Sequence, residues 1–561
     1  MKILSLKIES KNGFRSLPEG FEIKFRSNYN REDLSSFSPY CLVGLNGCGK
    51  SNVMEALAHI FYHVELCISE HLPDYIQNTG IFEPKNCVIQ AFTLEYIIRN
   101  DLDHDSNHSE LSLIKLSKKE KEAPKITITD LHLNSSETFS FSLDDCFKED
   151  IISLKQFLPQ YIVAYSSGEN ETLSIPFFKS RLLHLEEFKQ ATIGNYKDYI
   201  NPENNLIYVD ANMSQAILLC CLLFEDDNTL KTLADYRNTK LLGIQMFRMR
   251  LKGRKFRDVE GNSHSYFELL KRDLFPILQS CATMSWYDDE NDVYYFDFFV
   301  NEATKCAFRH YFNNSSMECF QMFRLLYELN NYSVSQDKIR DVLASKGIYT
   351  DEKIGSPSPE DDVFHFLDFF VKKQIDKEGN YEKMLLRQFS DGEHQFIHTM
   401  GICLLLKEKE SLLLLDEPET HFNPSWRSRF ISILHKTIQA ACSDNCGYID
   451  EINLRKEILI TSHSPFIISD CKAENVIIFE KNEEDKTVAQ SAADMRIATY
   501  GTSISLLMAR IFHSTASIGE HAEKGMKAIV NSGGTKEDII ENLNAEFGDS
   551  VEKLLTIDAL K

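Results

Sequence analysis

The chain has 561 residues, of which 43% are hydrophobic and 26% charged, and its formal net charge is −23 at pH 7. This length allows two or more domains with their own cores, and so much negative charge excludes a protein whose whole surface coats nucleic acid. The longest apolar run, residues 216–224, is too short to span a bilayer. Together with 14 irregularly spaced cysteines, typical of reduced thiols, and the lack of a secretory signal, it predicts a cytoplasmic protein without a membrane segment.

Residues 1–45 predict antiparallel strands that lead into a phosphate-binding loop. The loop matches G-x-x-x-x-G-K-[ST] at every position, follows a short apolar strand at 40–43, and precedes a helix that begins at Asn52. Its glycines allow a tight turn, and its amides with the helix N-terminus can hold phosphate oxygens. Lys50 is expected on the β- and γ-phosphates and Ser51 on Mg²⁺. The expected nucleotide-binding residues are Gly44, Leu45, Asn46, Gly47, Cys48, Gly49, Lys50, Ser51 and Asn52.

Strand patterns recur at 87–96, 111–116 and 161–165. Helical patterns dominate from 178 to 378, and a strand pair around residues 294–300 interrupts them. Within this second region, the stretch Lys240–Arg257 carries dense positive charge with two phenylalanines interleaved. It could track a phosphate backbone, or form a solvated helix face, or pair with the abundant acidic residues of the chain. The sequence leaves these interpretations open. The basic residues are Lys240, Arg248, Arg250, Lys252, Arg254, Lys255 and Arg257.

The α/β pattern returns after residue 380 with a helix that runs to Leu406. Ser390 is a suitable N-cap, and Glu393 follows three residues later, which predicts a capping box. The same helix N-terminus could instead bind an anion, because Gly392 permits a close approach of the ligand to the backbone. The motif by itself does not decide between these two functions.

Four leucines at 412–415 predict a strand that is buried on both faces, as in a parallel sheet. Asp416 and Glu417 stand at its exit, and in an open α/β sheet the carboxyl edge is where ligands bind. A second buried strand is predicted at 457–461, and His463 follows it. If the two strands are neighbours, this histidine can reach the terminal phosphate of a nucleotide.

The order of Gly44–Ser51, Phe389–Gln395, Leu412–Glu417 and His463 resembles the ATPase head of the ABC superfamily, and more narrowly its SMC-like and OLD-like soluble branch. The resemblance covers about half of the chain, residues 1–175 and 380–480. It implies an α/β fold, an ABC-type ATPase head of mixed β-sheet with flanking helices, split by a largely helical insert. The domains then expected are the two halves of the head at 1–177 and 379–500, the insert at 178–378, and a C-terminal helical tail at 501–561.

The resemblance also implies ATP and Mg²⁺ as cofactors and assigns roles to matching positions. Asp416, with Ser51, would hold Mg²⁺, Glu417 would orient or deprotonate the attacking water, and His463 would sense the γ-phosphate. In the family two heads dimerise with ATP sandwiched between them. The motif of Ser390, Gly392 and Glu393 would therefore complete the nucleotide site of a second subunit, and Asn423 and Pro424 would cross the dimer interface. For the family's Q-loop glutamine two candidates stay open, Gln90 and Gln160.

Several branches of the superfamily fit poorly. The motif Ser-Asp-Gly-Glu at 390–393 differs from the Ser-Gly-Gly-Gln usual in transporters, and the sustained heptads of an SMC-type DNA organiser are missing. Fewer than 100 residues follow His463, and they lack a convincing acidic triad of the kind that an OLD-type nuclease carries. The pattern Glu-x-x-x-His-Phe-x-Pro that begins at Glu417 is similar to the ATPases of bacterial restriction and anti-phage systems, closest to the PtuA family of Septu systems, including retron-linked versions.

This resemblance implies an ATP-hydrolysing component of anti-phage defence that controls a partner HNH nuclease in trans. Three alternatives stay open. A RecF-like repair or recombination ATPase would bind DNA directly through Lys240–Arg257. An OLD-like ATPase would carry its own nuclease, and a nucleotide-gated scaffold would need ATP binding without turnover.

Overall fold

A computed structural model shows three β-sheets with helices packed between and around them. Among the residues that it describes, no helix is both long and apolar enough to cross a membrane. The described residues are 1–26, 34–69, 72, 76, 80–100, 110–131, 138–144, 154–168, 170–193, 205–210, 213–234, 239–253, 270–332, 334–345, 354, 362–376, 378–407, 409–440, 453–514 and 518–560.

The central sheet has seven strands in the order β18-β17-β3-β16-β15-β8-β9. All neighbouring pairs are parallel except β17 and β18. The carboxyl ends of β3, β8, β15 and β16 therefore meet at one edge of the sheet. The strands are β3 (Tyr40–Gly44), β8 (Tyr161–Ser166), β9 (Leu206–Val209), β15 (Ser411–Asp416), β16 (Lys456–Thr461), β17 (Val476–Lys481) and β18 (Thr487–Ser491).

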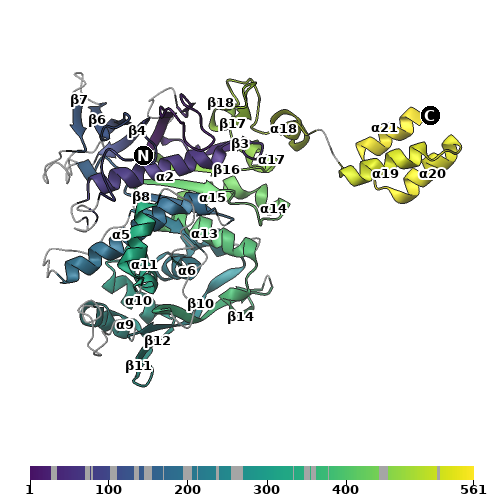
Figure 1. Ribbon diagram of the computed structural model, residues 1–561. Coiled ribbons are helices and arrows are strands. Elements are labelled where there is room, and N and C mark those ends of the chain that lie inside the picture. The colour runs from purple at the N-terminus through teal and green to yellow at the C-terminus, as the bar shows by residue number, and fades with distance from the viewer. Residues whose placement is uncertain are drawn as a thin grey trace.

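The four leucines of β15 explain how this sheet is covered on both faces. Leu412 and Leu414 point into one apolar core, and Leu413 and Leu415 point into the other. The first core contains α2 (Lys50–Cys67) and a six-stranded antiparallel sheet of order β2-β1-β4-β5-β6-β7. Figure 1 shows α2 between the two sheets. The six strands are β1 (Lys2–Ile8), β2 (Glu22–Lys24), β4 (Phe92–Asn100), β5 (Glu110–Lys118), β6 (Lys125–Asp130) and β7 (Thr138–Ser142).

The second core lies between the central sheet and a five-stranded antiparallel sheet of order β11-β12-β10-β13-β14. Helices fill the space between these two sheets (Figure 1). The strands are β10 (Leu241–Lys252), β11 (Met284–Asp288), β12 (Val293–Phe299), β13 (Phe364–Gln374) and β14 (Tyr381–Leu385). The helices of this part of the chain are α5 (Glu171–Ile193), α6 (Met213–Phe224), α7 (Asp227–Ala234), α9 (Phe275–Cys281), α10 (Glu302–Tyr311), α11 (Ser316–Glu328), α12 (Gln336–Ala344), α13 (Asp391–Leu405), α14 (Pro424–Arg427), α15 (Phe430–Ala440) and α17 (Pro465–Ser469).

The predicted α/β class with a mixed sheet and flanking helices is confirmed. The region 178–378, expected to be largely helical, contains four of the five strands of the second antiparallel sheet, including β12 at the strand pair expected around 294–300. The interpretation of Lys240–Arg257 as a helix face is wrong, because Leu241–Lys252 forms β10. Phe247, Met249 and Leu251 are buried and alternate with polar residues, and this period of two is the pattern of a half-buried strand. Arg254, Lys255 and Arg257 lie outside the described residues. The domain boundaries stay predictions.

The C-terminal residues are helical, with α18 (Ile504–Ile511) packed against α17. The last three helices have an apolar core of their own, built around Met526, Ile539 and Leu543. Figure 1 shows this unit standing apart from the rest of the chain. The three helices are α19 (Glu520–Asn531), α20 (Lys536–Glu546) and α21 (Val551–Leu560).

A buried ion pair ties the antiparallel sheet to the central sheet. The guanidinium of Arg26 pairs with the carboxylate of Glu457 in β16, which also accepts a hydrogen bond of 2.7 Å from the backbone N–H of Ile3 in β1. Glu457→Ala leaves a buried guanidinium without its partner, which costs about 3–5 kcal/mol. We therefore expect a large fall of the thermal unfolding midpoint. Glu22→Ala, which breaks the exposed pair with Lys24, is the matched control and should leave the midpoint nearly unchanged.

Candidate functional site

The site lies at the carboxyl edge of the central sheet, where four parallel strands end together. In the register of the sheet Asp416, the last residue of β15, is paired with Thr461 of β16 on one side and with Ser166 of β8 on the other. The strand β3 ends at Gly44 and lies next to β16. Strand order thus brings the phosphate loop, the acidic strand and the segment before His463 to one place.

The phosphate loop has the backbone that its glycines were expected to allow. Gly44, Gly47 and Gly49 have φ values of 143°, 76° and 91°, which residues with a side chain rarely adopt. At Gly49 a Cβ would also lie 2.5 Å from the hydroxyl of Ser16. Gly49 is the N-cap of α2 and provides no side-chain hydrogen bond to the helix, so first-turn amides remain to bind an anion.

The other loop residues divide into an exposed rim and a buried base. Leu45 is 49% exposed, Asn46 and Gly47 are also exposed, and Cys48 is buried. Asn52 accepts a hydrogen bond of 2.7 Å from Ser16, which fixes the first turn of α2 against the segment between β1 and β2. Asn52 is therefore placed beside the loop, with its side-chain oxygen already bonded to protein.

Lys50 lies across its own loop and is only 6% exposed. Its Nζ donates to the carbonyl oxygens of Gly44 at 3.1 Å and of Leu45 at 2.9 Å. Burial lowers the pKa of this ammonium, an effect that the nearby carboxylates of Glu417 and Asp416 oppose. The lysine is thus a cation held at the loop, within the field of the acidic strand.

Asp416 is the centre of the hydrogen-bond network. Its Oδ1 accepts from Ser51 Oγ at 2.8 Å and from Thr461 Oγ1 at 2.6 Å. Its Oδ2 accepts from Asn170 Nδ2 at 2.7 Å and from Ser166 Oγ at 3.4 Å. Four donors from three separate chain segments therefore hold one carboxylate that is 6% exposed.

Thr461, Asn170 and Ser166 were not singled out in the sequence. The sequence offered one indication that they are functional: Thr461 ends the predicted strand 457–461, and Ser166 and Asn170 follow the predicted strand 161–165. The Q-loop candidates lie elsewhere. Gln160 precedes β8, at the opposite edge of the sheet, where it accepts from the Glu410 amide at 3.3 Å, and Gln90 donates to the carbonyl oxygen of Cys87.

Glu417 and His463 face each other across the edge, with 3.4 Å between Glu417 Oε1 and His463 Nε2. Glu417 has a φ of 49°, and its N–H donates to Thr461 Oγ1 at 3.0 Å. Both side chains are partly exposed, 42% and 34%, so solvent reaches them. Burial and the charge of Lys50 lower the pKa of His463, which favours a neutral imidazole at neutral pH.

A second carboxylate, Glu419, holds the segment that carries the histidine. It is 4% exposed and accepts a hydrogen bond from the Ser462 hydroxyl, which in turn accepts from the Ser464 amide at 2.9 Å. Burial raises the pKa of Glu419 to about 7. The residues on both sides of His463 are therefore anchored to the loop that follows β15.

The helix α13 begins with the predicted capping box between Ser390 and Glu393, and Ser390 is exposed. Glu393 also forms an ion pair of 2.7 Å with Lys373 of β13. A Cβ at Gly392 would lie 2.9 Å from the carbonyl oxygen of His421. The glycine thus allows α13 to pack on the loop after β15, which is a structural reason for it beside any contact with phosphate.

Among the described residues, neither Ser390 nor Gly392 forms a side-chain hydrogen bond with the phosphate loop of the same chain, and Ser390 is bonded to Glu393. Asn423 caps the short helix α14 by accepting from the Trp426 amide at 2.9 Å, and Pro424 is its first residue. The roles of these residues toward a second subunit stay predictions.

The donor set fits Mg²⁺. The Ser51 hydroxyl and the Asp416 carboxylate are 2.8 Å apart, and both are the oxygen ligands that this ion prefers. Among the described residues no group of three or more His, Cys, Asp or Glu could hold a metal ion. Mg²⁺ on a nucleotide does not need such a group, because phosphates and water complete its coordination.

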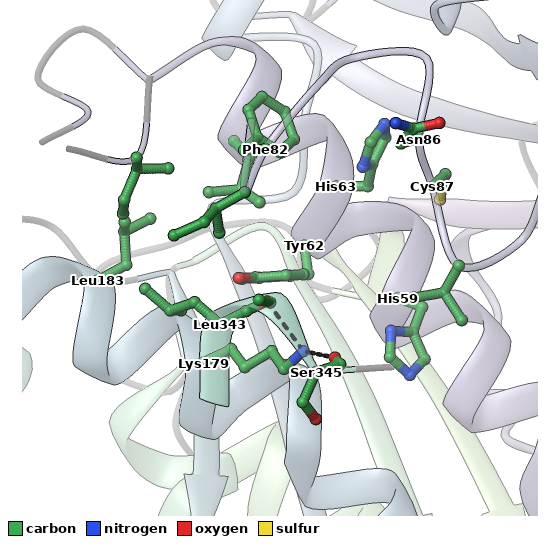
Figure 2. Close-up of a pocket in the computed structure, with 15 residues that line it drawn as sticks. His59, Tyr62, His63, Phe82, Asn86, Cys87, Lys179, Leu183, Leu343 and Ser345 are labelled. Carbon is green, nitrogen blue, oxygen red and sulfur yellow. Dashed lines mark hydrogen bonds between the residues drawn. The ribbon is translucent and has the colours of Figure 1, made fainter. Parts of the chain in front are cut away.

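A cavity of about 90 Å³ lies along the second half of α2 and is separate from this site (Figure 2). Lys179 reaches the carbonyl oxygens of Leu343 and Ser345 there. Burial lowers the pKa of Lys179 to about 8 and that of His63 to about 4. None of the residues that line the cavity belongs to the network around Asp416.

Comparison with known families finds one matching model, described as "AAA domain, putative AbiEii toxin, Type IV TA system", over residues 255–469. The match includes Ser390, Asp416, Glu417 and His463 and begins downstream of the phosphate loop. It covers less than half of the chain. This region is therefore similar to an AAA-type ATPase domain.

Among solved structures, similar chains include an SMC head bound to the C-winged helix domain of ScpA and the SMC head domain from Thermotoga maritima. Both are 9% identical and cover 88% of this chain, with 100% and 99% of their own lengths covered and TM-scores of 0.32 and 0.29. No curated protein matches the chain. At TM-scores this low the functional assignment depends on the geometry of the site itself.

The buried Glu419 makes a prediction about pH. Its folded pKa of about 7 lies above the ordinary 4.5, so the folded state binds more protons between these values, and stability falls as the pH rises through this window. The loss amounts to roughly 3 kcal/mol when the window is crossed. Glu419→Gln keeps a neutral group of the same shape, and we expect it to unfold at a higher temperature than the parent at pH 8 but at a similar one at pH 5. The same change at Glu474, which is 69% exposed, is the control, and an equal gain at both pH values would contradict the prediction.

Proposed function

We propose that this chain binds ATP with Mg²⁺ at the carboxyl edge of the central sheet and hydrolyses it. One observation carries the proposal: Ser51 of the phosphate loop donates to Asp416 at 2.8 Å although the two are 365 positions apart. Lys50, Glu417 and His463 lie around the same point. The described residues therefore provide a phosphate cradle, metal ligands and a base together.

In this proposal the loop amides and the N-terminus of α2 hold the phosphate oxygens. Lys50 exchanges the carbonyl oxygens of Gly44 and Leu45 for phosphate oxygens that carry a full charge. Ser51 and Asp416 would hold Mg²⁺, which would supply positive charge next to the transferred phosphoryl group. The attacking water is then handled by Glu417, and the γ-phosphate is contacted by His463.

Glu417 orients the attacking water and accepts its proton. The Glu417 side chain is 42% exposed, so water can reach it from solvent. A neutral imidazole can donate one N–H to a γ-phosphate oxygen, and the lowered pKa of His463 favours that form. Phosphoryl transfer needs positioning and charge stabilisation more than covalent chemistry, and these residues supply both.

We further propose that two copies of the head close over ATP, with the exposed Ser390 of each copy facing the phosphates held by the other. The capping box and the Lys373 ion pair hold Ser390 at the start of α13. Gln395 of the same helix accepts from the His421 amide at 3.0 Å, in the loop that begins with Glu417. A shift of α13 on closure of a second copy would thus be passed to the loop that carries Glu417.

The resemblance to PtuA-type ATPases and the family model, which describes a putative toxin of a toxin–antitoxin system, support a role in bacterial anti-phage defence. In this role the nucleotide state of the head dimer controls a partner HNH nuclease in trans. A DNA-binding RecF-like ATPase is the alternative from the sequence, and nuclease assays separate the two.

The proposal is tested with the purified full chain. Lys50→Ala should lose ATP binding, because the loop loses its only buried ammonium at the phosphates. Glu417→Gln should keep ATP binding and Mg²⁺ but lower turnover by about 10²-fold or more, since the base is lost, and should increase the dimer fraction seen by light scattering with ATP. Full turnover by Glu417→Gln would rule out its role as the base.

The partner is tested separately with a nuclease assay on plasmid DNA. The chain alone should not cut DNA with Mg²⁺ or Mn²⁺, and cutting should need both the chain and an HNH nuclease. Metal-dependent cleavage by the chain alone, abolished by a substitution in the chain, would overturn control in trans while leaving the ATPase proposal intact.

We predict that Thr461 positions Asp416 and Glu417 for hydrolysis. Thr461→Val keeps the shape but removes the hydroxyl that bonds both Asp416 and the Glu417 amide. We expect kcat for ATP to fall about tenfold, equivalent to about 1.4 kcal/mol, with a smaller change in KM. Thr437→Val removes an equally buried hydroxyl in α15, which donates to Met400 at 3.6 Å, and should leave kcat unchanged.

A further inference from the structure

The five-stranded sheet is covered on one side by helices. Phe247, Phe298 and Phe366 belong to the core that it shares with the central sheet, and Phe308 of α10 packs on the first two at 6.4 and 5.6 Å between ring centroids. In Figure 1 the helices of this part lie between the two sheets, with β10, β12 and β14 on their far side. The opposite side of the sheet, which we call the outer face, turns away from the ATP site.

The register of the strands defines the outer face. The pairs Trp286–Tyr295 and Met246–Phe370 lie directly opposite each other across neighbouring strands, as do Met246 and Phe299. Phe299 is 51% exposed and Met284 is 59% exposed. The residues of the outer face, by register and by alternation from the buried ones, are Met246, Arg248, Arg250, Lys252, Met284, Trp286, Asp288, Tyr295, Asp297, Phe299, His365, Asp368, Phe370, Lys372, Tyr381, Lys383 and Leu385.

Cations on this face lie beside aromatic rings. Lys383 Nζ is 3.9 Å from the centroid of Phe370, and Lys372 Nζ is 5.5 Å from that of Tyr381. The guanidinium of Arg248 lies 5.1 Å from the Trp286 ring, which stacks on Tyr295 at 4.9 Å with an angle of 13° between the planes. Rings and cations therefore alternate over the surface and are not gathered into separate patches.

The charge of the outer face is opposite to that of the chain. Five basic residues on the strands stand against Asp288, Asp297 and Asp368, whereas the whole chain has a net charge of −23. The carboxylate of Asp362, just before β13, also interacts with Arg250 and Lys252. Arg248 is neutralised by Asp297, with 2.5 and 2.7 Å between the paired atoms. Much of the positive charge that could hold phosphates therefore comes from Lys372 of β13 and Lys383 of β14, and less comes from the basic stretch in β10.

We propose that the outer face binds single-stranded nucleic acid, with bases stacked on its rings and phosphates held by its lysines and arginines. Unpaired bases stack on aromatic side chains presented by a sheet, and phosphates need nearby cations. A duplex hides the faces of its bases, so it can use the cations but not the rings. A single strand can use the rings and the cations together, and the local excess of positive charge on an acidic chain favours a polyanion.

The experiment measures binding of the full chain, without nucleotide, to a fluorescent single strand of about 20 nucleotides and to the matching duplex, by anisotropy at several salt concentrations. We expect tighter binding of the single strand. Phe299→Ala and Trp286→Ala should each weaken it about fivefold or more without changing the salt dependence, because stacking is lost. The double variant Lys372→Glu and Lys383→Glu should weaken it at least tenfold, on the order of two phosphate contacts, and flatten the salt dependence.

The matched control is the double variant Lys524→Glu and Lys527→Glu on α19, which makes the same charge change on lysines that are 71% and 69% exposed. It should bind the single strand like the parent. Thermal unfolding and ATP turnover of every variant check that the fold is intact. The proposal is overturned if the chain does not bind the single strand. It is also overturned if the duplex binds with equal affinity and the variants Phe299→Ala and Trp286→Ala bind like the parent. Equal effects of the two lysine double variants on affinity would overturn it as well. Because nucleotide is absent, these outcomes do not depend on the ATPase proposal.

Discussion

The carboxylate of Asp416 is the group on which the rest of the structure depends. A buried carboxylate is unfavourable unless hydrogen bonds and charges replace its water. Here Ser51, Thr461, Asn170 and Ser166 do so at the end of β15. These donors reach Asp416 only if β16 and β8 flank β15 and if α2 begins at the carboxyl edge of the same sheet. The strand order of the central sheet and the hydrogen bonds of this acid thus support each other.

Around this group the loop after β15 connects the parts of the molecule. Its first residue, Glu417, is bonded to β16 through Thr461, and Glu419 holds Ser462 beside His463. The same loop packs so closely on the start of α13 that only a glycine fits at position 392. Movement of α13 or of the histidine segment would therefore change the position of the proposed base.

A second connection runs from this loop to the five-stranded sheet. Lys373 of β13 pairs with Glu393 in the capping box of α13, and its neighbour Lys372 belongs to the outer face. One strand thus carries both a cation for the proposed nucleic-acid surface and the lysine whose ion pair holds the start of α13. Such a strand gives a physical route by which occupancy of the outer face and closure over ATP can influence each other.

The sequence by itself determined the local features. The glycines of the phosphate loop, the capping box at Ser390 and the doubly buried strand at 412–415 follow from backbone sterics, short-range hydrogen bonds and hydrophobic pattern, and the structure shows all three. These features are encoded within about ten neighbouring residues, so a single sequence is enough to predict them.

Only the tertiary structure decided which distant groups meet. Thr461 and Asn170 looked like ordinary polar residues until strand order placed them on Asp416. A solvated helix face was one of the interpretations that the charge of Lys240–Arg257 left open, but residues 241–252 form β10 because their apolar residues alternate and because β12 and β13 pair with them. Hydrogen-bond partners and sheet neighbours far apart in the chain are chosen by packing over the whole fold, and no local pattern contains that information.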